Sequence, residues 1–168
     1  DLAEIKNRNK AKVKNQASEG EKNRNLANKI WQKSKIIKSS DPESYQLAKS
    51  YFTEHRKIST EHYSDLLKKG LIRFNKYKDD IMLVYPSLST ETAILALENK
   101  HFNVYRIQKI FLNPDGSKHH KGKRHLGSNG NESAAFVIPP LNEQVESKHA
   151  AVCEGLEDAL SVRYEYPE

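Results

Sequence analysis

The sequence of 168 residues contains a single cysteine, Cys153. One thiol excludes an intrachain disulfide and every zinc module that needs several cysteine ligands. No apolar run approaches the ~18 to 20 residues that span a bilayer, and the amino-terminal residues are charged where a signal peptide would need an apolar core. We therefore expect a soluble, cytoplasmic protein that makes no membrane contact.

Apolar residues are also few. Hydrophobic residues make up 36% of the chain and glycine contributes seven positions, which leaves the apolar content below the ~45–50% of an average globular domain. The length suits one ordinary domain, or a small domain with an appendage. We expect a modest core, with part of the chain in solvated helix or loop.

Positive charge is concentrated at the amino-terminal end. Residues 1–40 contain eleven Lys and Arg against four Asp and Glu, a net charge of +7, whereas the whole chain is +6, so the remainder carries −1. Apolar residues are few before Leu26, which predicts a solvated helix whose packed end lies near Trp31. Two interpretations remain open: a helical arm or linker from an upstream domain, or a direct contact with nucleic acid.

A helical segment is expected over residues 41–70. Asp41 can cap a helix whose first residue is Pro42, and apolar residues recur at helical spacing as far as His55. A second short helix from about Thr60 ends at Gly70, which suits a left-handed C-cap.

From residue 71 onward the pattern is typical of strands. Short runs rich in β-branched and aromatic residues are separated by turn-forming residues, at 71–74, 81–85, 93–97, 104–112 and 135–138. The sequence Asn113–Gly116 predicts a turn, because Pro114 presets φ and Gly116 accepts a positive φ.

The basic stretch from Lys118 to His125 is expected to be a loop. We assign nucleic-acid binding to its four cations and to one arginine of the preceding strand, because such side chains neutralise phosphates without reading sequence; these residues are Lys118, Lys121, Lys123, Arg124 and Arg106. An ordinary solvated loop is the alternative. The histidines lack carboxylate or cysteine partners at ligand spacing, so no metal site is predicted in this chain.

Residues 150–153 are expected to form a buried strand that stops at Glu154–Gly155 and turns into a helix near Leu156. Ligand sites of α/β sheets lie at strand carboxyl ends, so Glu154 is the candidate catalytic residue. The alternative is that Glu154 caps the helix. Glu157 and Asp158 lie in the first turn, where acidic residues favour the helix dipole.

Residues 151–161, with the sequence AVCEGLEDALS, resemble the opening of a Toprim domain, the nucleotidyl-transfer and cleavage module of bacterial-type primases and topoisomerases. The preceding pieces resemble the region that leads into Toprim in phage, plasmid and conjugation-associated primases; they are Tyr45–Ile58, Leu71–Phe74, Tyr105–Gly116 and Lys121–Gly127. The resemblance implies that Glu154 acts as a general acid/base near phosphate, with Mg²⁺ or Mn²⁺ held in the full-length protein.

This chain departs from the Toprim pattern in one respect that matters for chemistry. The family's metal-binding strand ending in Asp-x-Asp does not follow, and Asp79–Asp80 stands in the wrong place and order. We therefore expect an excised fragment that is catalytically silent by itself, holds no cofactor, and belongs to a protein that also carries the metal site.

Together these patterns predict an α+β protein. The expected parts are a basic helical arm (1–40), a helical segment (41–70), a β-rich domain (71–147) and the truncated start of an α/β Toprim domain (148–168). The expected function is that of a DNA primase-like protein in replication or conjugative transfer of a mobile element. The alternative function is that of a non-catalytic DNA-binding or partner-docking module of a conjugative relaxase or helicase. Single-stranded or duplex DNA is the expected partner, with a helicase or relaxase as a further one.

Overall fold

The computed structural model describes residues 2–88, 102–128, 135–139 and 151–165. It has an α+β fold built on a five-stranded antiparallel sheet, as expected. The elements are α1 (Leu2–Lys33), β1 (Lys35–Ile36), α2 (Pro42–Lys49), the π-helix η1 (Ser50–His55), the 3₁₀-helix η2 (Thr60–His62), α3 (Ser64–Lys68), β2 (Arg73–Tyr77), β3 (Asp80–Ser87), β4 (Arg106–Leu112), β5 (Lys118–Gly127) and α5 (Leu156–Glu165). The strands follow one another in chain order, so β5 is an edge strand.

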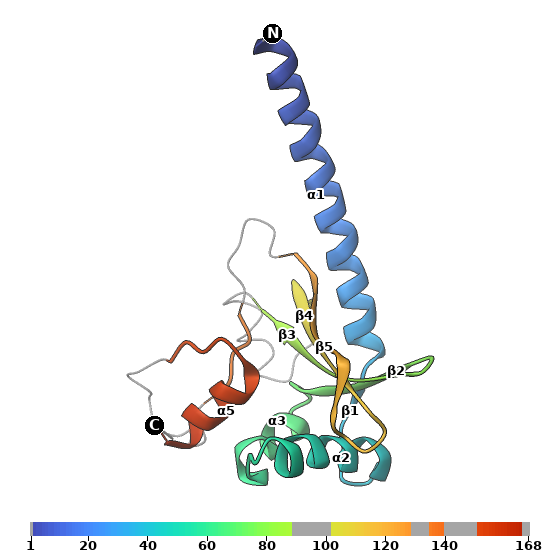
Figure 1. Cartoon of the computed structure of the whole chain (residues 1–168), viewed down its shortest axis with the longest axis vertical. Helices are drawn as coiled ribbons and strands as arrows, with labels where there is room; N and C mark the ends of the chain where they lie inside the picture. Colours follow the sequence, from blue (N-terminus) through green and yellow to red (C-terminus); the bar gives the residue numbers. More distant parts are fainter. Residues whose placement is uncertain (1, 89–101, 129–134, 140–150, 166–168) are drawn as a thin grey trace.

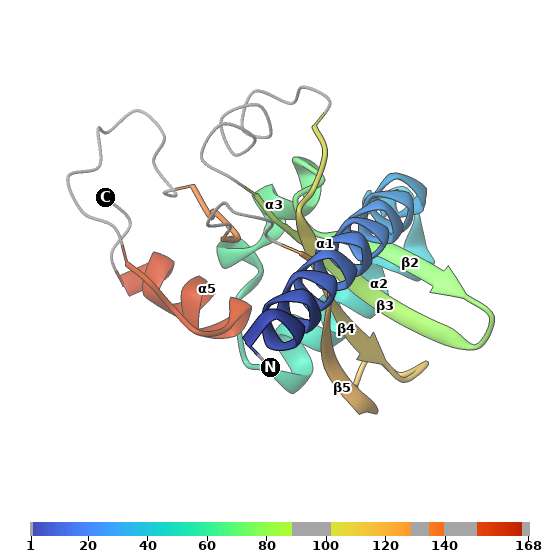
Figure 2. The ribbon, with the colours of Figure 1, turned by 90° about the horizontal axis from the view of Figure 1, so that it is seen from above.

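The sheet lies between two layers of helix. Figures 1 and 2 show α1 crossing one face while α2 and α3 lie on the other, and the amino-terminal part of α1 extends well beyond the sheet. No helix among the described residues combines the length and the apolar character needed to cross a membrane.

The helix α1 is held to the sheet near its carboxyl end. Trp31 is buried, and the guanidinium of Arg73 on β2 lies 3.8 Å from the centre of its indole ring. One turn earlier, the Asn28 side chain both accepts a hydrogen bond from the backbone N–H of Val104 and donates one to its carbonyl, each 2.7 Å long. The expectation that the basic helix packs near Trp31 is confirmed.

The helical segment supports the opposite face. It begins at Pro42, as expected, although Asp41 forms no side-chain capping bond. Its apolar spacing directs Leu47, Tyr51 and Phe52 inward, where they are buried. Gly70 ends the segment with a φ of +67°, which confirms the left-handed C-cap.

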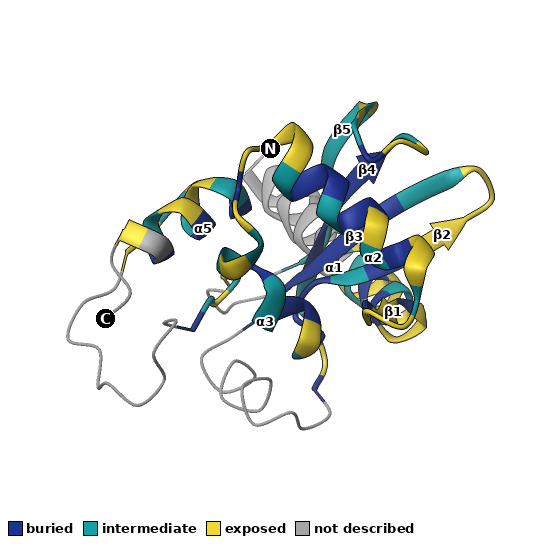
Figure 3. Ribbon diagram, turned by 90° about the horizontal axis from the view of Figure 1, so that it is seen from below, coloured by how far each residue is buried: buried dark blue, intermediate teal, exposed yellow. Residues whose placement is uncertain are grey.

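The expected strands 71–74, 81–85 and 104–112 correspond to β2, β3 and β4, whereas 93–97 lies outside the described residues. The basic stretch from residue 118 is strand β5 and not a loop. Figure 3 shows that β4 is largely buried, whereas the residues of β5 are intermediate or exposed. Because β5 is paired on one side only, it tolerates a polar composition, and its sequence therefore does not look like that of a strand.

Two other expected strands are wrong. In 135–138 only Ala135 pairs, through an isolated bridge to Leu88. Residues 151–153 form no strand, and Val152 is 100% exposed. A short apolar run predicts a strand only if a neighbouring strand can pair with it, and the described part of the chain provides none there. The helix expected after Gly155 does begin at Leu156, which is buried together with Leu160.

The turn at Asn113–Gly116 forms as expected and packs against the helices. The N–H of Gly116 donates to the Asn113 carbonyl at 2.9 Å, and Ser50 of η1 donates to the Asp115 carbonyl at 2.8 Å. Gly116 has a φ of +84°, and a Cβ placed on it would lie 2.6 Å from Ser50 Cβ. The turn therefore depends on glycine for its backbone conformation and for its close approach to η1.

We predict that Gly116→Ala lowers the free energy of unfolding by about 2–4 kcal/mol, because it adds about 1 kcal/mol of backbone strain and a clash with Ser50 that costs about 1–3 kcal/mol more. The control is Gly122→Ala: that glycine has a φ of +67°, but its Cβ would meet nothing closer than 3.8 Å. The control should lose about 1 kcal/mol, from backbone strain alone. Urea denaturation measures both, and equal losses would contradict the close packing of the turn.

Candidate functional site

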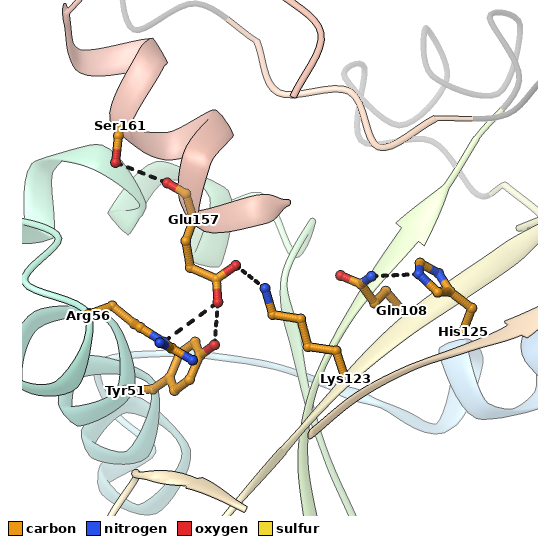
Figure 4. A network of polar contacts seen from close by, with 7 residues as sticks. All are labelled: Tyr51, Arg56, Gln108, Lys123, His125, Glu157 and Ser161. Atoms are coloured by element: carbon orange, nitrogen blue, oxygen red, sulfur yellow. Dashed lines mark hydrogen bonds and ion pairs between the residues drawn. The ribbon is translucent and has the colours of Figure 1, made fainter. Parts of the chain in front are cut away.

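Four polar side chains from three elements meet between the sheet and α5 (Figure 4). Glu157, the second residue of α5, accepts a hydrogen bond from the Tyr51 hydroxyl at 2.5 Å. Its other oxygen forms an ion pair with Lys123 of β5. Arg56, which follows η1, places Nε 3.7 Å from the oxygen that Tyr51 contacts. We call Tyr51, Arg56, Lys123 and Glu157 the Glu157 cluster.

The local folds of η1 and β5 fix the positions of the three groups around the carboxylate. Tyr51 is fully buried and packs edge-on against Phe52, with ring centres 5.1 Å apart. The Arg56 guanidinium lies 5.3 Å from the centre of the Tyr51 ring. Lys123 stands opposite Ile110 in the β4–β5 ladder, so both side chains lie on the same face of the sheet. This is the face on which Lys123 meets Glu157 of α5.

Burial and hydrogen bonding compete in setting the charge of the cluster. Burial alone would raise the pKa of Glu157, but hydrogen bonds from Lys123 and Tyr51 outweigh it and hold that pKa below its ordinary value of 4.5. Burial, with the Glu157 carboxylate beside it, raises the pKa of Tyr51. At neutral pH the cluster therefore contains an ionised carboxylate, two cations and a neutral phenol that donates.

A second polar pair lies next to the cluster on the same face of the sheet (Figure 4). Gln108 Nε2 and His125 Nε2 are 2.8 Å apart, and they face each other across β4 and β5. Burial and the nearby Arg106 both lower the pKa of His125, so this ring is neutral at physiological pH. Among the described residues, Gln108 Oε1 and Arg106 Nε are buried without a hydrogen-bond partner.

Some of the predicted nucleic-acid-binding residues form ion pairs within the protein, and others are exposed. Lys123 belongs to the Glu157 cluster, and Lys121 forms an ion pair with Asp80 at the start of β3. Lys118 and Arg124 are exposed. Arg124 stands opposite Lys109 in the ladder, so it occupies the face opposite to that of Lys123.

The predicted catalytic residue, Glu154, is exposed. It follows residues that form no strand, and no other described residue makes a hydrogen bond or ion pair with it. Its carboxylate does not cap α5, whose first backbone bond runs from the Ala159 N–H to the Gly155 carbonyl at 3.0 Å. The partly buried carboxylate is instead that of Glu157, three residues later. The sequence predicted only that Glu157, in the first helical turn, would interact favourably with the helix dipole.

The described residues do not fit a divalent metal ion. No three His, Cys, Asp or Glu side chains converge in this part of the chain, and the Glu157 carboxylate is already surrounded by two cations. The rings of His119 and His120 contact each other at a tilt of 39°, with centres 3.9 Å apart, and His119 Nδ1 accepts a hydrogen bond from the Lys121 N–H at 3.2 Å. What the site offers is a set of donors for an oxyanion.

We predict that Glu157 stabilises the fold above its unfolded pKa and that this stability is lost in acid. Because the folded pKa is depressed, the unfolded state binds more protons, and stability falls as the pH drops below about 4.5 toward the folded pKa. Urea unfolding of Glu157→Gln between pH 3 and 7 should show a flatter pH dependence than the parent chain. Asp158→Asn, which neutralises the exposed neighbouring carboxylate, should keep the parent's dependence; equal flattening in both variants would contradict the assignment.

Comparisons of the chain with protein-family models, with curated proteins and with solved structures find no match. Its function must therefore be inferred from its own residues and their geometry.

Proposed function

We propose that this chain binds nucleic acid as part of a DNA primase-like protein that acts in replication or conjugative transfer of a mobile element. The edge strand β5 supplies the phosphate contacts. Its ten residues contain four Lys or Arg and three His, and no Asp or Glu. Lys118 and Arg124 are exposed on this edge strand, so a polyanion can approach these two cations directly.

The observation that carries the proposal is a pair of like charges at this edge. Lys109 and Arg124 stand directly opposite each other on β4 and β5, an arrangement that destabilises a sheet. Burial and then the Arg124 charge lower the pKa of Lys109, and Asp80 only partly opposes them. A bound phosphate would relieve this repulsion, which is why we favour an anionic partner over a purely structural role for the strand.

The basic helix α1 adds a second, longer-range attraction. Residues 1–40 carry a net charge of +7, and Figure 1 shows that the amino-terminal part of α1 projects beyond the sheet. Lys22, Lys29 and Lys33 are exposed on the part of the helix closer to the sheet. Such a field raises the rate and affinity of polyanion binding without conferring sequence preference.

Binding is better supported than catalysis by the described residues. A role for Glu154 as general acid/base rests on the resemblance to Toprim domains, and Mg²⁺ or Mn²⁺ would need carboxylates other than those described. The second candidate is therefore a non-catalytic DNA-binding or docking module of a conjugative relaxase or helicase.

We predict that the chain binds single-stranded DNA in a salt-dependent manner and that Lys118→Gln/Arg124→Gln weakens this dependence. Each lost phosphate contact should reduce the slope of log affinity against log salt by about 0.7, so the double variant should lose about 1.4. Fluorescence anisotropy with a labelled oligonucleotide at several salt concentrations measures the slope.

The matched control is Lys68→Gln/Lys78→Gln, which removes two exposed lysines that lie outside both β5 and residues 1–40. It should retain most of the parent slope, because its lysines contact no phosphate. Equal effects of the two double variants would assign the binding to net charge alone, and a parent chain that does not bind at low salt would refute the proposal.

A further inference from the structure

Two hydrogen-bond donors, Tyr51 and Lys123, and a nearby cation, Arg56, surround one oxyanion in the Glu157 cluster. Lys123 and Arg56 provide two positive charges and Tyr51 provides a neutral hydroxyl donor, all directed at the same carboxylate. We infer that Tyr51, Arg56 and Lys123 form a phosphate-binding site, and that the carboxylate of Glu157 occupies it in this structure and competes with phosphate for it. The inference extends the proposed nucleic-acid function to a second group of contacts.

The donor set matches phosphate chemistry. Arginine and lysine form short charge-assisted hydrogen bonds with carboxylate and phosphate alike, and two cations around a single carboxylate leave one positive charge uncompensated within the cluster. A terminal phosphate carries more negative charge and more acceptor oxygens than a carboxylate, and a backbone phosphodiester carries the same single charge. Either group would therefore satisfy Tyr51, Arg56 and Lys123 at least as well.

The Tyr51 ring, the Arg56 guanidinium and the backbone of Lys123 are held by contacts that do not involve Glu157. The buried ring of Tyr51 is fixed by its packing against Phe52, and the Arg56 guanidinium lies over that ring. Lys123 is positioned by the ladder between β4 and β5. If Glu157 withdrew, two cations would remain close together and partly buried, a state that strongly favours uptake of another anion.

Only the Glu157 side chain has to move. The carboxyl-terminal half of α5 is anchored by buried Leu160 and by Arg163, whose guanidinium donates to both carboxylate oxygens of Asp65 at 2.8 and 2.5 Å. These contacts can keep the helix in place while Glu157, near its amino end, is displaced. A Cβ placed on Gly155 would lie 3.7 Å from Lys123 Nζ, so the amino end of α5 lies beside the site.

The strand β5 connects this site with the proposed nucleic-acid contacts. Lys123 directs its side chain to the Glu157 cluster, and Arg124, the next residue, points to the other face of the same edge strand. A phosphate at the Glu157 cluster could belong to a nucleic-acid backbone that reaches this edge, or to a nucleotide. Both ligands offer phosphate oxygens to Tyr51, Arg56 and Lys123, and binding measurements distinguish them.

The test compares four variants with the parent chain. Glu157→Gln removes the competing charge and should raise the affinity for the phosphate ligand about tenfold, the effect of freeing one charge-assisted hydrogen bond. Asp158→Asn makes the same change of net charge at the neighbouring exposed position and should change affinity less than about twofold. Glu157→Gln/Lys123→Gln removes a donor as well and should lose the gain.

Glu157→Asp keeps the net charge and withdraws the carboxylate by one methylene, so it should give an intermediate gain that bulk charge cannot explain. It also provides a test if Glu157→Gln does not fold, which circular dichroism would reveal. Each variant is titrated with a labelled single-stranded oligonucleotide by fluorescence anisotropy and with ATP, without metal, by calorimetry. A gain with the oligonucleotide alone identifies a backbone site, and a gain with both ligands identifies a site for terminal phosphates as well.

Equal gains in Glu157→Gln and Asp158→Asn, or a gain that survives the loss of Lys123, would overturn the inference. The result is separable from that of the proposed function. If the parent binds DNA through Lys118 and Arg124 but neither Glu157 variant binds either ligand more tightly, only the competition by Glu157 fails. If no variant binds the oligonucleotide while Glu157→Gln gains affinity for ATP, the phosphate site stands and the nucleic-acid function fails.

Discussion

A carboxylate removed from water needs hydrogen-bond donors or cations to compensate for its lost hydration. The donors and cations around Glu157 bring together the elements that form the candidate site. The Glu157 side chain is 16% exposed, and the loss of hydration is offset by Lys123 and Tyr51. Tyr51 is 106 positions away in the chain. The requirement therefore joins α5 to the helical segment and to the edge of the sheet, and it places two cations at a single point.

The alternation of a β-strand explains how one basic strand can serve two purposes. Lys123 and Arg124 are adjacent, yet they point to opposite faces of the sheet. Lys123 is directed toward the helices and forms an internal ion pair, whereas Arg124 is exposed beside another cation. If the same residues formed a flexible loop, nothing would separate these roles. The edge position of β5 makes both arrangements possible, because its outer side remains open to solvent.

Much of the fold could be predicted from local pattern. The start of α2 at Pro42, the turn at Asn113–Gly116 and the strands β2 to β4 follow from turn chemistry and from β-rich composition, which depend on neighbouring residues. The errors have a common cause. The strand β5 looks polar because only one of its sides is paired, and residues 151–153 look like a strand although no described strand pairs with them. Pairing is a property of the assembled sheet and leaves little trace in a short sequence window.

For the candidate site, the sequence by itself determined that the amino-terminal segment and the stretch after residue 117 are basic, and that a helix begins close to Glu154. Composition and local spacing are sufficient for such statements. Only the tertiary structure decided that Glu157, and not Glu154, enters a polar cluster, and that Lys123 faces it while Lys118 and Arg124 stay exposed. The reason is physical: burial and electrostatic compensation depend on distances between groups far apart in the chain, and those distances exist only once the sheet and helices have packed.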